Sequence, residues 1–399
     1  MPTTYTGTTN TGASSLGGSS SAGLVQQAYD RLLEFALRSE PLIRSVADKT
    51  PARQSIPGST VVLQRYVDLA ANTTPLTESA DPDAVALSTP TPVSITLSEY
   101  GNSVLVTRAL ELFSLADVDP AIANIIAFNL ADSIDSVAMT TLRGGTNKIY
   151  GGNATSTVTV DAADTLDSAD VRKVVAKLRS NKAIGRKGSL YWAGIHPEVS
   201  HDLRAESSSG QGWLLPNQYG SSQDRIWAGE IGNYEGAYYI ESARMYSSKA
   251  GADQTALATA SAVSGVSGEL TIVAANAAFG GRAEVGDKIS GTNVGTSAKI
   301  TAISVGATNT TFTVDVANSG TVGTNTLTVT PVTRVYNTIV CGQQAMAQAV
   351  AEEPHVVIGP VVDKLMRHRP MGWYGVLGFA IYRQEALYRI ETGSSIGAL

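Results

Sequence analysis

The longest regular pattern of apolar residues lies between residues 117 and 145, in the segment DVDPAIANIIAFNLADSIDSVAMTTLRGG. Apolar or small residues recur there every three or four positions, at Ile122, Ile126, Leu130, Ile134, Val137, Ala138 and Thr141, with Ile125 widening the stripe. We expect a helix that starts at Asp119–Pro120, with Asp119 as its cap, and stops at Gly144–Gly145, where both glycines are free to take a left-handed conformation. A helix of about 25 residues is roughly 37 Å long, so the pattern predicts a strut.

The polar face of this strut carries short side chains, which suit close packing better than a solvated surface. These side chains are Asn124, Asn129, Asp132, Asp135 and Ser136. Taken alone, the pattern also fits a long core helix of an ordinary α/β protein. The order of the flanking segments favours a different interpretation.

The first part of the chain combines polar and extended patterns. Residues 1–23 are almost wholly Thr, Ser, Gly and Asn, which predicts a flexible N-terminal arm, either a tail without a role or an arm that orders against a neighbouring subunit. Residues 24–57 are expected to hold an amphipathic helix, over residues 24–38, and a connection. Residues 58–106 contain two strand-like runs around a polar, proline-rich tip, which predicts an extended two-stranded loop. Such a hairpin is not stable alone, so it must rest on another protein surface.

Beyond the strut, residues 151–247 alternate between helix and strand patterns, as in an α/β region. Asp167 or Ser168 is expected to cap a helix with an apolar and a basic face. The expected inward residues are Val171, Val174, Val175 and Leu178, and the expected outward residues are Arg172, Lys173, Lys177 and Arg179. An apolar strand, a turn at His196–Pro197, a short helix and another strand follow.

Residues 248–333 change character, because Thr, Val, Ala, Ser and Gly dominate and short alternating runs are separated by turn signals. This pattern predicts an inserted β-sandwich or barrel domain. The segments ARMYSS before it and TRVYNTIV after it have the pattern of host-domain strands, which places the two ends of the insertion close together. Residues 334–399 return to the host pattern, and VVIGPVVDKL and the segment from Gly372 are expected to pair in a sheet.

Composition narrows the class of protein further. The chain has 399 residues and a formal net charge of -6, which leaves no strong electrostatic footprint for nucleic acid. Cys341 is the single cysteine, so an internal disulfide framework is excluded and a buried, inert thiol is expected. The N-terminal sequence has no secretory pattern, and we expect no membrane helix and an origin in a cytoplasm.

Candidate chemistry is weak throughout the chain. His196, Glu198 and His201 resemble a metal motif, but the histidines are five apart and Pro197 disturbs the helical spacing that zinc ligands need. His355 and His368 have no paired nucleophile, and no phosphate-binding glycine motif occurs. The remaining candidates are the loop carboxylates Glu78, Asp81, Asp83 and Glu99, the glycosylation patterns at Asn72 and Asn153, and the basic cluster Lys182, Arg186 and Lys187. We expect solvated carboxylates and a solvated basic loop, with weak contact to nucleic acid as the second interpretation, and no enzyme, cofactor or metal site.

The order of elements resembles the major capsid protein of tailed bacteriophages, whose capsid fold is shared with herpesviruses. Three stretches carry the resemblance: GNSVLVTRALELFS with the strut and LRGG, YWAGIHPEVSHDLRAE, and GWYGVLGFAIYRQEALYRIETGSS. The resemblance covers roughly residues 24–246 and 334–395. It implies an α+β fold with an N-terminal arm, an extended loop, a peripheral domain over residues 107–150 with a short helix at 107–113 and the strut, and an axial domain over residues 151–247.

The resemblance implies a mechanical function. Many copies would form pentamers and hexamers of an icosahedral shell around double-stranded DNA, assembled in the host bacterial cytoplasm with a separate scaffolding protein, a portal and a cement protein as partners. Some members of the fold join subunits through a loop lysine, but no lysine occurs between Lys49 and Lys148, so a shell held non-covalently is expected. The inserted domain would either project outward, as a decoration or as a module that binds glycans or a host surface, or stiffen a local contact. The alternatives are another phage structural protein or adhesin, or an α/β enzyme with an accessory β domain.

Overall fold

The computed structural model describes residues 41–51, 59–66, 68–73, 75–76, 78, 84–108, 118–205, 230–275, 282–360, 365 and 367–396. The predicted arm over residues 1–23, the helix over residues 24–38, most of the short helix over residues 107–113, Asp81 and Asp83 lie outside these residues. The chain divides into two compact units. One comprises Met1–Arg38, Gly101–Leu130 and Pro354–Tyr374, and the other comprises Ser39–Tyr100, Ala131–Glu353 and Gly375–Leu399.

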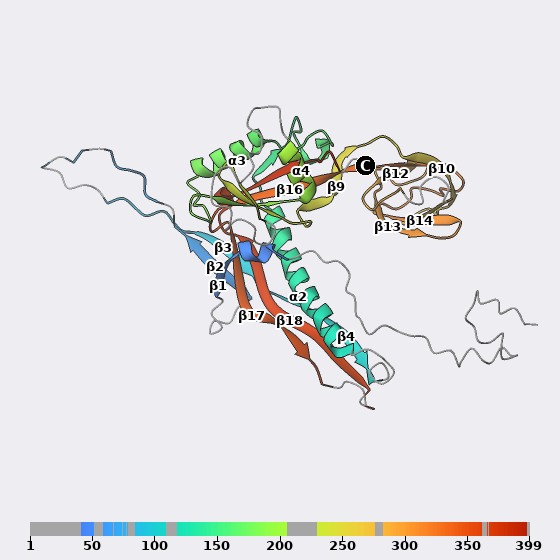
Figure 1. The fold of residues 1–399 in the computed structure, drawn as a ribbon, viewed down its shortest axis with the longest axis horizontal. Coiled ribbons are helices and arrows are strands. Elements are labelled where there is room, and N and C mark those ends of the chain that lie inside the picture. Colours follow the sequence, from blue (N-terminus) through green and yellow to red (C-terminus); the bar gives the residue numbers. More distant parts are fainter. Residues whose placement is uncertain are drawn as a thin grey trace, which may run out of the picture. The chain divides into compact units, whose positions relative to one another are not determined.

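A mixed seven-stranded sheet is the centre of the larger unit (Figure 1). Its main order is β5-β19-β16-β6-β8-β7, and β9 pairs with β16. The strands are β5 (Lys148–Tyr150), β6 (Tyr191–Ile195), β7 (Glu230–Tyr234), β8 (Ala237–Glu241), β9 (Tyr246–Asp253), β16 (Val332–Cys341) and β19 (Leu387–Thr392). Along β6, Tyr191, Ala193 and Ile195 belong to one core cluster and Trp192 to another. This alternation buries both faces of the sheet.

Helices α3 (Ser168–Ser180) and α4 (Pro197–Ala205) supply one of these two cores. The Asp167 side chain accepts a hydrogen bond from the Asp170 amide at 2.8 Å, so the predicted cap is confirmed. The four predicted inward residues of α3 are buried and its four predicted outward cations are exposed. Local pattern alone was sufficient here, because an amphipathic helix on a sheet buries one continuous stripe.

The predicted strut is α2 (Val118–Arg143), a continuous helix of 26 residues. It starts at Val118, which corrects the predicted start at Asp119–Pro120. Neither Gly144 nor Gly145 has a positive φ, which corrects the expected left-handed ending. Gly145 instead allows close packing, because a Cβ there would lie 2.9 Å from Leu387 Cδ2.

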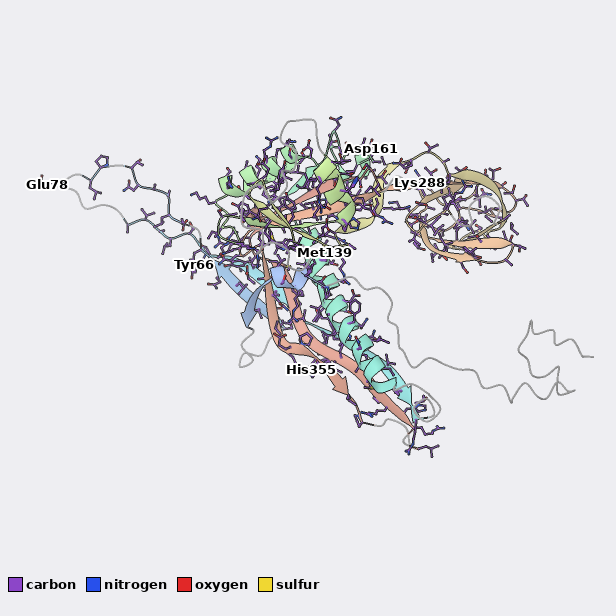
Figure 2. The ribbon with its side chains drawn as sticks, in the orientation of Figure 1. Tyr66, Glu78, Met139, Asp161, Lys288 and His355 are labelled. Atoms are coloured by element: carbon purple, nitrogen blue, oxygen red, sulfur yellow. The ribbon has the colours of Figure 1, made fainter. Side chains whose placement is uncertain are left out.

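No membrane helix is expected from the sequence, but α2 contains a long apolar segment. Residues Ile122–Arg143 are long and apolar enough, by length and composition, to cross a membrane. A core helix passes the same test, and Ala138, Met139 and Leu142 are buried in the core cluster that contains Trp192. Figure 2 labels Met139 on this helix. The length of the apolar run therefore assigns no membrane role.

A four-stranded sheet has the order β1-β17-β18-β4, with a short 3-10 helix, η2 (Ile43–Val46), just before its first strand. The strands are β1 (Asp48–Pro51), β4 (Ser98–Thr107), β17 (Met346–Ile358) and β18 (His368–Ile381). The predicted pairing of the two C-terminal segments is confirmed, because β17 and β18 are neighbours.

The extended loop is built on β2 (Thr60–Arg65) and β3 (Thr91–Thr96), which pair antiparallel from Thr60↔Thr96 to Arg65↔Thr91. We call residues 60–96 the hairpin. The second strand-like run of residues 58–106, which begins near residue 93, is not a single strand of this loop. The structure divides that run, because β3 pairs with β2 whereas β4 joins the four-stranded sheet.

Residues 258–330 form a six-stranded sheet of order β12-β15-β10-β11-β14-β13. The strands are β10 (Ala258–Ser264), β11 (Thr271–Ala275), β12 (Lys288–Gly291), β13 (Ile300–Val305), β14 (Asn309–Val314) and β15 (Thr326–Thr330). The Ile289 amide donates to the Ala298 carbonyl at 2.9 Å, and the Ile300 amide donates to the Asp287 carbonyl at 2.9 Å. These bonds join the two outer strands, so the sheet closes like a barrel around Ile272, Phe312 and Leu327.

The closed sheet is connected through β9 and β16, which pair with each other. Lys249 of β9 lies 2.5 Å from the buried Asp287 and 3.0 Å from Glu284. Lys288, labelled in Figure 2, pairs with Asp253 of β9 at 3.0 Å. Besides the two covalent connections of the chain, these ion pairs therefore hold the closed sheet to β9.

Candidate functional site

The base of the hairpin is fixed to its own chain by an apolar cluster. Ile95 of β3 is fully buried against Ala347 and Ala349 of β17. The partly buried residues around this cluster are Val61, Leu63, Leu97, Ala380 and Tyr382. Alternate side chains of β2 and β3 supply these contacts, as expected for a strand pair with one buried face.

Two further contacts hold the same base. Gly378 of β18 allows β3 to approach, because an added Cβ would collide with the Thr96 carbonyl oxygen. Arg65 binds Glu385 through two hydrogen bonds, of 2.9 and 3.2 Å, in the bidentate geometry that suits a guanidinium and a carboxylate. The hydrogen bond from Arg65 lowers the pKa of the Glu385 carboxyl.

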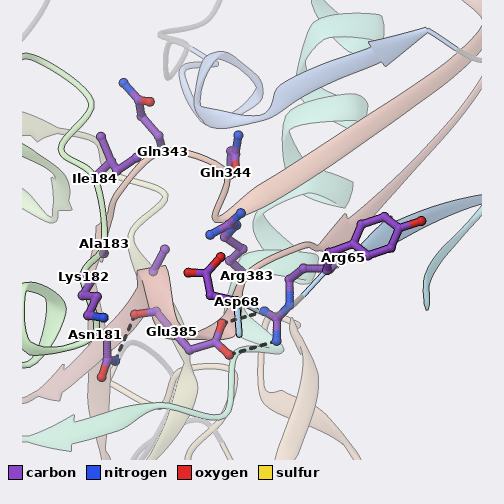
Figure 3. Close-up of a pocket in the computed structure, with 12 residues that line it drawn as sticks. Arg65, Asp68, Asn181, Lys182, Ala183, Ile184, Gln343, Gln344, Arg383 and Glu385 are labelled. Atoms are coloured by element: carbon purple, nitrogen blue, oxygen red, sulfur yellow. Dashed lines mark hydrogen bonds and ion pairs between the residues drawn. The ribbon is translucent and has the colours of Figure 1, made fainter. Parts of the chain in front are cut away.

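A hollow of about 270 Å³ lies beside this ion pair (Figure 3). It is lined from the hairpin by Arg65, Tyr66 and Asp68, and from the turn after α3 by residues 181–184. The remaining lining residues are Gln343, Gln344, Arg383, Glu385 and Ala386. Its wall carries cations, carboxylates and amides, which suits a polar peptide segment better than an apolar ligand.

The hairpin exposes large apolar side chains, on the outward side of β2 and beyond the base. Val62, Tyr66, Leu69, Leu76, Val85 and Leu87 are between 54% and 78% exposed. Figure 2 labels Tyr66 near the base and Glu78 near the tip. Apolar residues concentrated on one extended segment indicate a contact surface rather than the scattered exposure that ordinary proteins show. The hairpin is therefore the candidate functional site.

The predicted loop carboxylates are described in part. Glu78 lies in an exposed turn and Glu99 is exposed on β4. Asp81 and Asp83 lie outside the described residues. The structure therefore brings no acid/base pair together from Glu78 and Glu99, which lie in different elements.

The histidine motif separates into two environments. His196 is buried, its Nδ1 accepts a hydrogen bond from the Glu198 amide at 3.3 Å, and its ring lies 4.8 Å from that of Tyr336. Burial lowers the pKa of His196. His201 is exposed, with its Nδ1 3.3 Å from Asp202. Within the described residues no group of three or more His, Cys, Asp and Glu side chains is arranged to hold a metal ion.

The other candidates occupy ordinary structural positions. His355 is exposed on β17, and His368 is the first residue of β18. Cys341 is buried at the end of β16, as predicted, and burial raises the pKa of its thiol to about 12. In the basic cluster, Lys182 and Lys187 are exposed, whereas Arg186 pairs with Asp48 at 3.2 Å.

A buried ionic cluster on α2 was missed by sequence reasoning. Asp135 is fully buried, and it accepts hydrogen bonds from the Arg44 amide at 3.0 Å and from Arg244 at 3.1 Å. Arg244 also pairs with Asp132. Burial raises the pKa of Asp135, and backbone hydrogen bonds oppose that effect. The cluster ties α2 to the segments before β1 and before β9.

Comparisons with known proteins identify the family. The model for the phage capsid protein family matches residues 123–388, more than half of the chain. The capsid of Ralstonia phage GP4 has a TM-score of 0.60 at 12% identity, covering 95% of this chain and 96% of that chain. The capsid of Cyanophage P-SCSP1u has a TM-score of 0.57 at 11% identity, covering 95% and 96%. The mature capsid of bacteriophage PhiM1 has a TM-score of 0.54 at 11% identity, covering 92% of both chains.

A comparison with curated protein sequences finds no match. At these low identities the solved structures establish the fold, which is the mixed α and β capsid fold of tailed phages. The family match adds the identity of the protein as a structural component of the virion. The chain belongs to the phage capsid protein family and is a structural major capsid protein.

Proposed function

We propose that many copies of this chain assemble, as pentamers and hexamers, into the icosahedral head of a tailed phage that encloses double-stranded DNA. Assembly takes place in the host bacterial cytoplasm, without a membrane, and the role is mechanical rather than catalytic. One observation carries the proposal. The hairpin is anchored at its base by Ile95 and Arg65, yet its apolar side chains farther out are exposed.

The energetics of such a shell favour many modest contacts. Full burial of one large apolar side chain contributes about 1.5–3 kcal/mol. Several of these side chains on each hairpin, repeated over every subunit, stabilise a shell without requiring a large interface between any two copies.

We also propose that the shell is held without covalent crosslinks. The hairpin contains no lysine, since none occurs between Lys49 and Lys148. A crosslink between a hairpin lysine and a neighbouring carboxyl or amide side chain therefore cannot form. The capsid chain of purified particles boiled in denaturant should run as a single band at the mass of one chain, and a ladder of covalent oligomers would contradict the proposal.

Other components complete the proposed head. Size control is assigned to a separate scaffolding protein, with a portal for DNA entry and a cement protein as a further partner. Contact with the packaged DNA is weak and non-specific, in keeping with a net charge of -6. Shells of one correct size from this chain alone would contradict the need for scaffolding.

Residues 248–333 are proposed as an inserted domain, supported by the closed sheet and by the pairing of β9 with β16. It either decorates the outer surface or stiffens a local contact between subunits. Replacing residues 254–331 with a short turn distinguishes these roles. Normal shell yield and thermal stability indicate decoration, and a reduced yield or stability indicates a contact.

The primary experiment is negative-stain electron microscopy of the purified protein, combined with sedimentation. Closed shells, or rings of five or six subunits, are the expected result. A monodisperse monomer or dimer under every assembly condition would overturn the proposed function.

A further inference from the structure

A strongly basic surface lies on α3 and the turn that follows it. Residues 171–187 contain no Asp or Glu, and their basic residues are Arg172, Lys173, Lys177, Arg179, Lys182, Arg186 and Lys187. All of these except Arg186 are exposed, because the apolar stripe of α3 faces the seven-stranded sheet. We call the exposed side of α3 together with residues 181–187 the basic face. Since the whole chain has a net charge of -6, the surface outside the basic face is more acidic still.

The basic face is almost free of large apolar side chains. The other exposed residues of α3 beyond Val171 are Ala176 and Ser180. Within residues 171–187, all of which the structure describes, Ile184 is the one large apolar residue that is exposed, at 64%. The core of a protein–protein interface is depleted of charged residues, whereas a contact with a nucleic-acid backbone is polar and strongly positive. The composition of the basic face therefore fits a phosphate backbone better than a protein surface.

Several cations of the basic face are not paired with carboxylates of their own chain. Lys173 pairs with Asp170 at 2.8 Å, and Arg186 pairs with Asp48 at 3.2 Å. Within the described residues, three of the remaining cations form no ion pair, namely Lys177, Arg179 and Lys182. The 13 residues of α3 span about 20 Å, which is the axial length of roughly six base pairs of duplex DNA. The helix therefore presents unpaired cations over a length that covers several phosphates.

We propose that the basic face contacts the phosphate backbone of the packaged duplex, so that the layer of α3 and α4 lines the inside of the shell. This inference rests on the proposed function and assigns a surface to the weak DNA contact stated there. The two helices share one core cluster on one face of the sheet (Figure 1). A local basic surface gives each subunit only a few phosphate contacts, so the binding is independent of sequence and sensitive to salt.

DNA binding by unassembled chains tests the surface without requiring shells. One variant carries Lys177→Gln, Arg179→Gln and Lys182→Gln, and its affinity for a fluorescent duplex is measured by anisotropy at several salt concentrations. The affinity at low salt should fall by about tenfold or more, and the slope of log affinity against log salt should flatten by about 3, because each lost phosphate contact removes about one unit.

A matched control removes the same number of charges elsewhere in the chain. It replaces three other exposed cations and should bind DNA as the wild-type chain does: Arg108→Gln, Arg282→Gln and Arg367→Gln. An equal loss of affinity in the control would show that net charge alone decides binding, and would overturn the proposal.

A charge-conserving variant separates loss of charge from loss of fold. Lys177→Arg, Arg179→Lys and Lys182→Arg together should keep the wild-type affinity for DNA. Circular dichroism and thermal unfolding should be the same for all variants, because the three positions are exposed. If the Gln variant unfolds early, Lys177→Gln alone replaces it, with an expected change in slope of about 1.

Labelling of assembled shells shows which side of the wall carries the basic face. Cys341 is buried, so a thiol introduced by Lys177→Cys should be the reactive one. A maleimide joined to a polymer too large to cross the wall should react with unassembled chains and not with intact shells. Reaction with intact shells would place the basic face outside and overturn the proposal.

Full and emptied particles distinguish an inner surface from a contact between subunits. A small maleimide that enters the particle should label the Lys177→Cys thiol faster after the DNA has been released than before. Equally slow labelling of full and emptied particles would show that the thiol is buried between subunits, which would also overturn the proposal.

The outcomes separate the inference from the function on which it depends. If the wild-type chain forms no shells under any condition, the proposed function fails, whereas the affinity of unassembled chains for DNA still reports on the basic face. If shells form but the Gln variant binds DNA as the wild-type chain does, the proposed function stands and the DNA surface is wrong. Normal DNA affinity of the Gln variant together with a reduced yield of shells would reassign the basic face to a contact between proteins.

Discussion

The seven-stranded sheet with its helices and the hairpin use apolar residues in opposite ways. On α3, Val171, Val174 and Leu178 are fully buried against the sheet of their own chain. On the hairpin, Leu76, Val85 and Leu87 have similar side chains but are more than 70% exposed. The apolar residues of the first region are buried within a single chain, whereas under the proposed function those of the second are buried by partners. The proposal therefore separates residues needed for folding from residues needed for assembly.

The comparison predicts that changes in the two regions affect different measurements. A core substitution should lower the free energy of unfolding of the isolated chain, and assembly should fail as a consequence. A hairpin substitution should leave that free energy nearly unchanged and reduce only the yield of shells. Unfolding in urea and sedimentation of assembled material measure these two quantities separately.

The largest expected effect is that of Arg244→Ala. This change leaves the buried Asp135 carboxylate without its cation, which should lower the free energy of unfolding by about 3–5 kcal/mol. The hairpin contains no buried ionic cluster in its described residues, so no single hairpin change should match this loss. Urea unfolding of the isolated chain measures it, and a loss below about 1 kcal/mol would contradict the assigned role.

The same variant should depend on pH. Burial raises the pKa of Asp135 above its ordinary value of 3.8, so the folded chain holds this proton more tightly than the unfolded chain. The contribution is fully present below the ordinary pKa and is lost as pH rises through the raised pKa. Stability of Arg244→Ala should therefore increase on mild acidification, and adding Asp135→Asn should remove that dependence.

Leu178→Ala should be the next most severe change. Leu178 is fully buried between α3 and the sheet, and the cavity should cost about 2–5 kcal/mol. Ala176→Ser, at an exposed position of the same helix, is the control and should change stability by less than about 0.5 kcal/mol. Equal effects of the two substitutions would contradict the packing of α3 on the sheet.

Gly378→Ala tests how the base of the hairpin is anchored on the four-stranded sheet. The added methyl group collides with the Thr96 backbone, so β3 must shift, at a cost of about 1–3 kcal/mol. Hydrogen exchange should become faster at the amides of β2 and β3 and stay unchanged in α3. Uniformly faster exchange throughout the chain would show that the hairpin base is not a separable element.

The smallest effect on folding is expected from Leu76→Ser with Leu87→Ser. Both positions are exposed, so the isolated chain should keep its stability within about 0.5 kcal/mol per site, while shell yield falls because apolar contacts between copies are lost. Val305→Ser, at a position 60% exposed on the closed sheet, is the matched control and should retain assembly. Normal yield from the hairpin variant would remove the hairpin from the interface.

The local pattern of apolar and polar residues predicted the elements that pack through one continuous apolar stripe. Helix α3, with its Asp167 cap and buried valines, and the end of α2 at Arg143 follow from the sequence. The first residue of α2 and the φ values of Gly144 and Gly145 did not follow from the sequence. Gly145 packs against Leu387, which is close in space but remote in sequence.

The pairing of distant segments was the main part that pattern could not predict. Asp135 and Arg244 are 109 positions apart, so nothing in the local sequence of either residue indicates the other. The division of one strand-like run into β3 and β4 has the same origin, because each part pairs with a different remote strand. Similarly, alternation within residues 258–330 allowed a sandwich or a barrel, and the hydrogen bonds of Ile289 and Ile300 close the sheet.

The sequence by itself determined the strut, the amphipathic α3, the buried Cys341, the charge of the hairpin and the order of elements that resembles a phage capsid protein. These properties depend on residues near one another in the chain or on composition. Only the tertiary structure decided which apolar residues of the hairpin are anchored and which are exposed, and which cation accompanies the buried Asp135. Burial and pairing depend on where remote segments meet, and that meeting is set by packing of the whole chain.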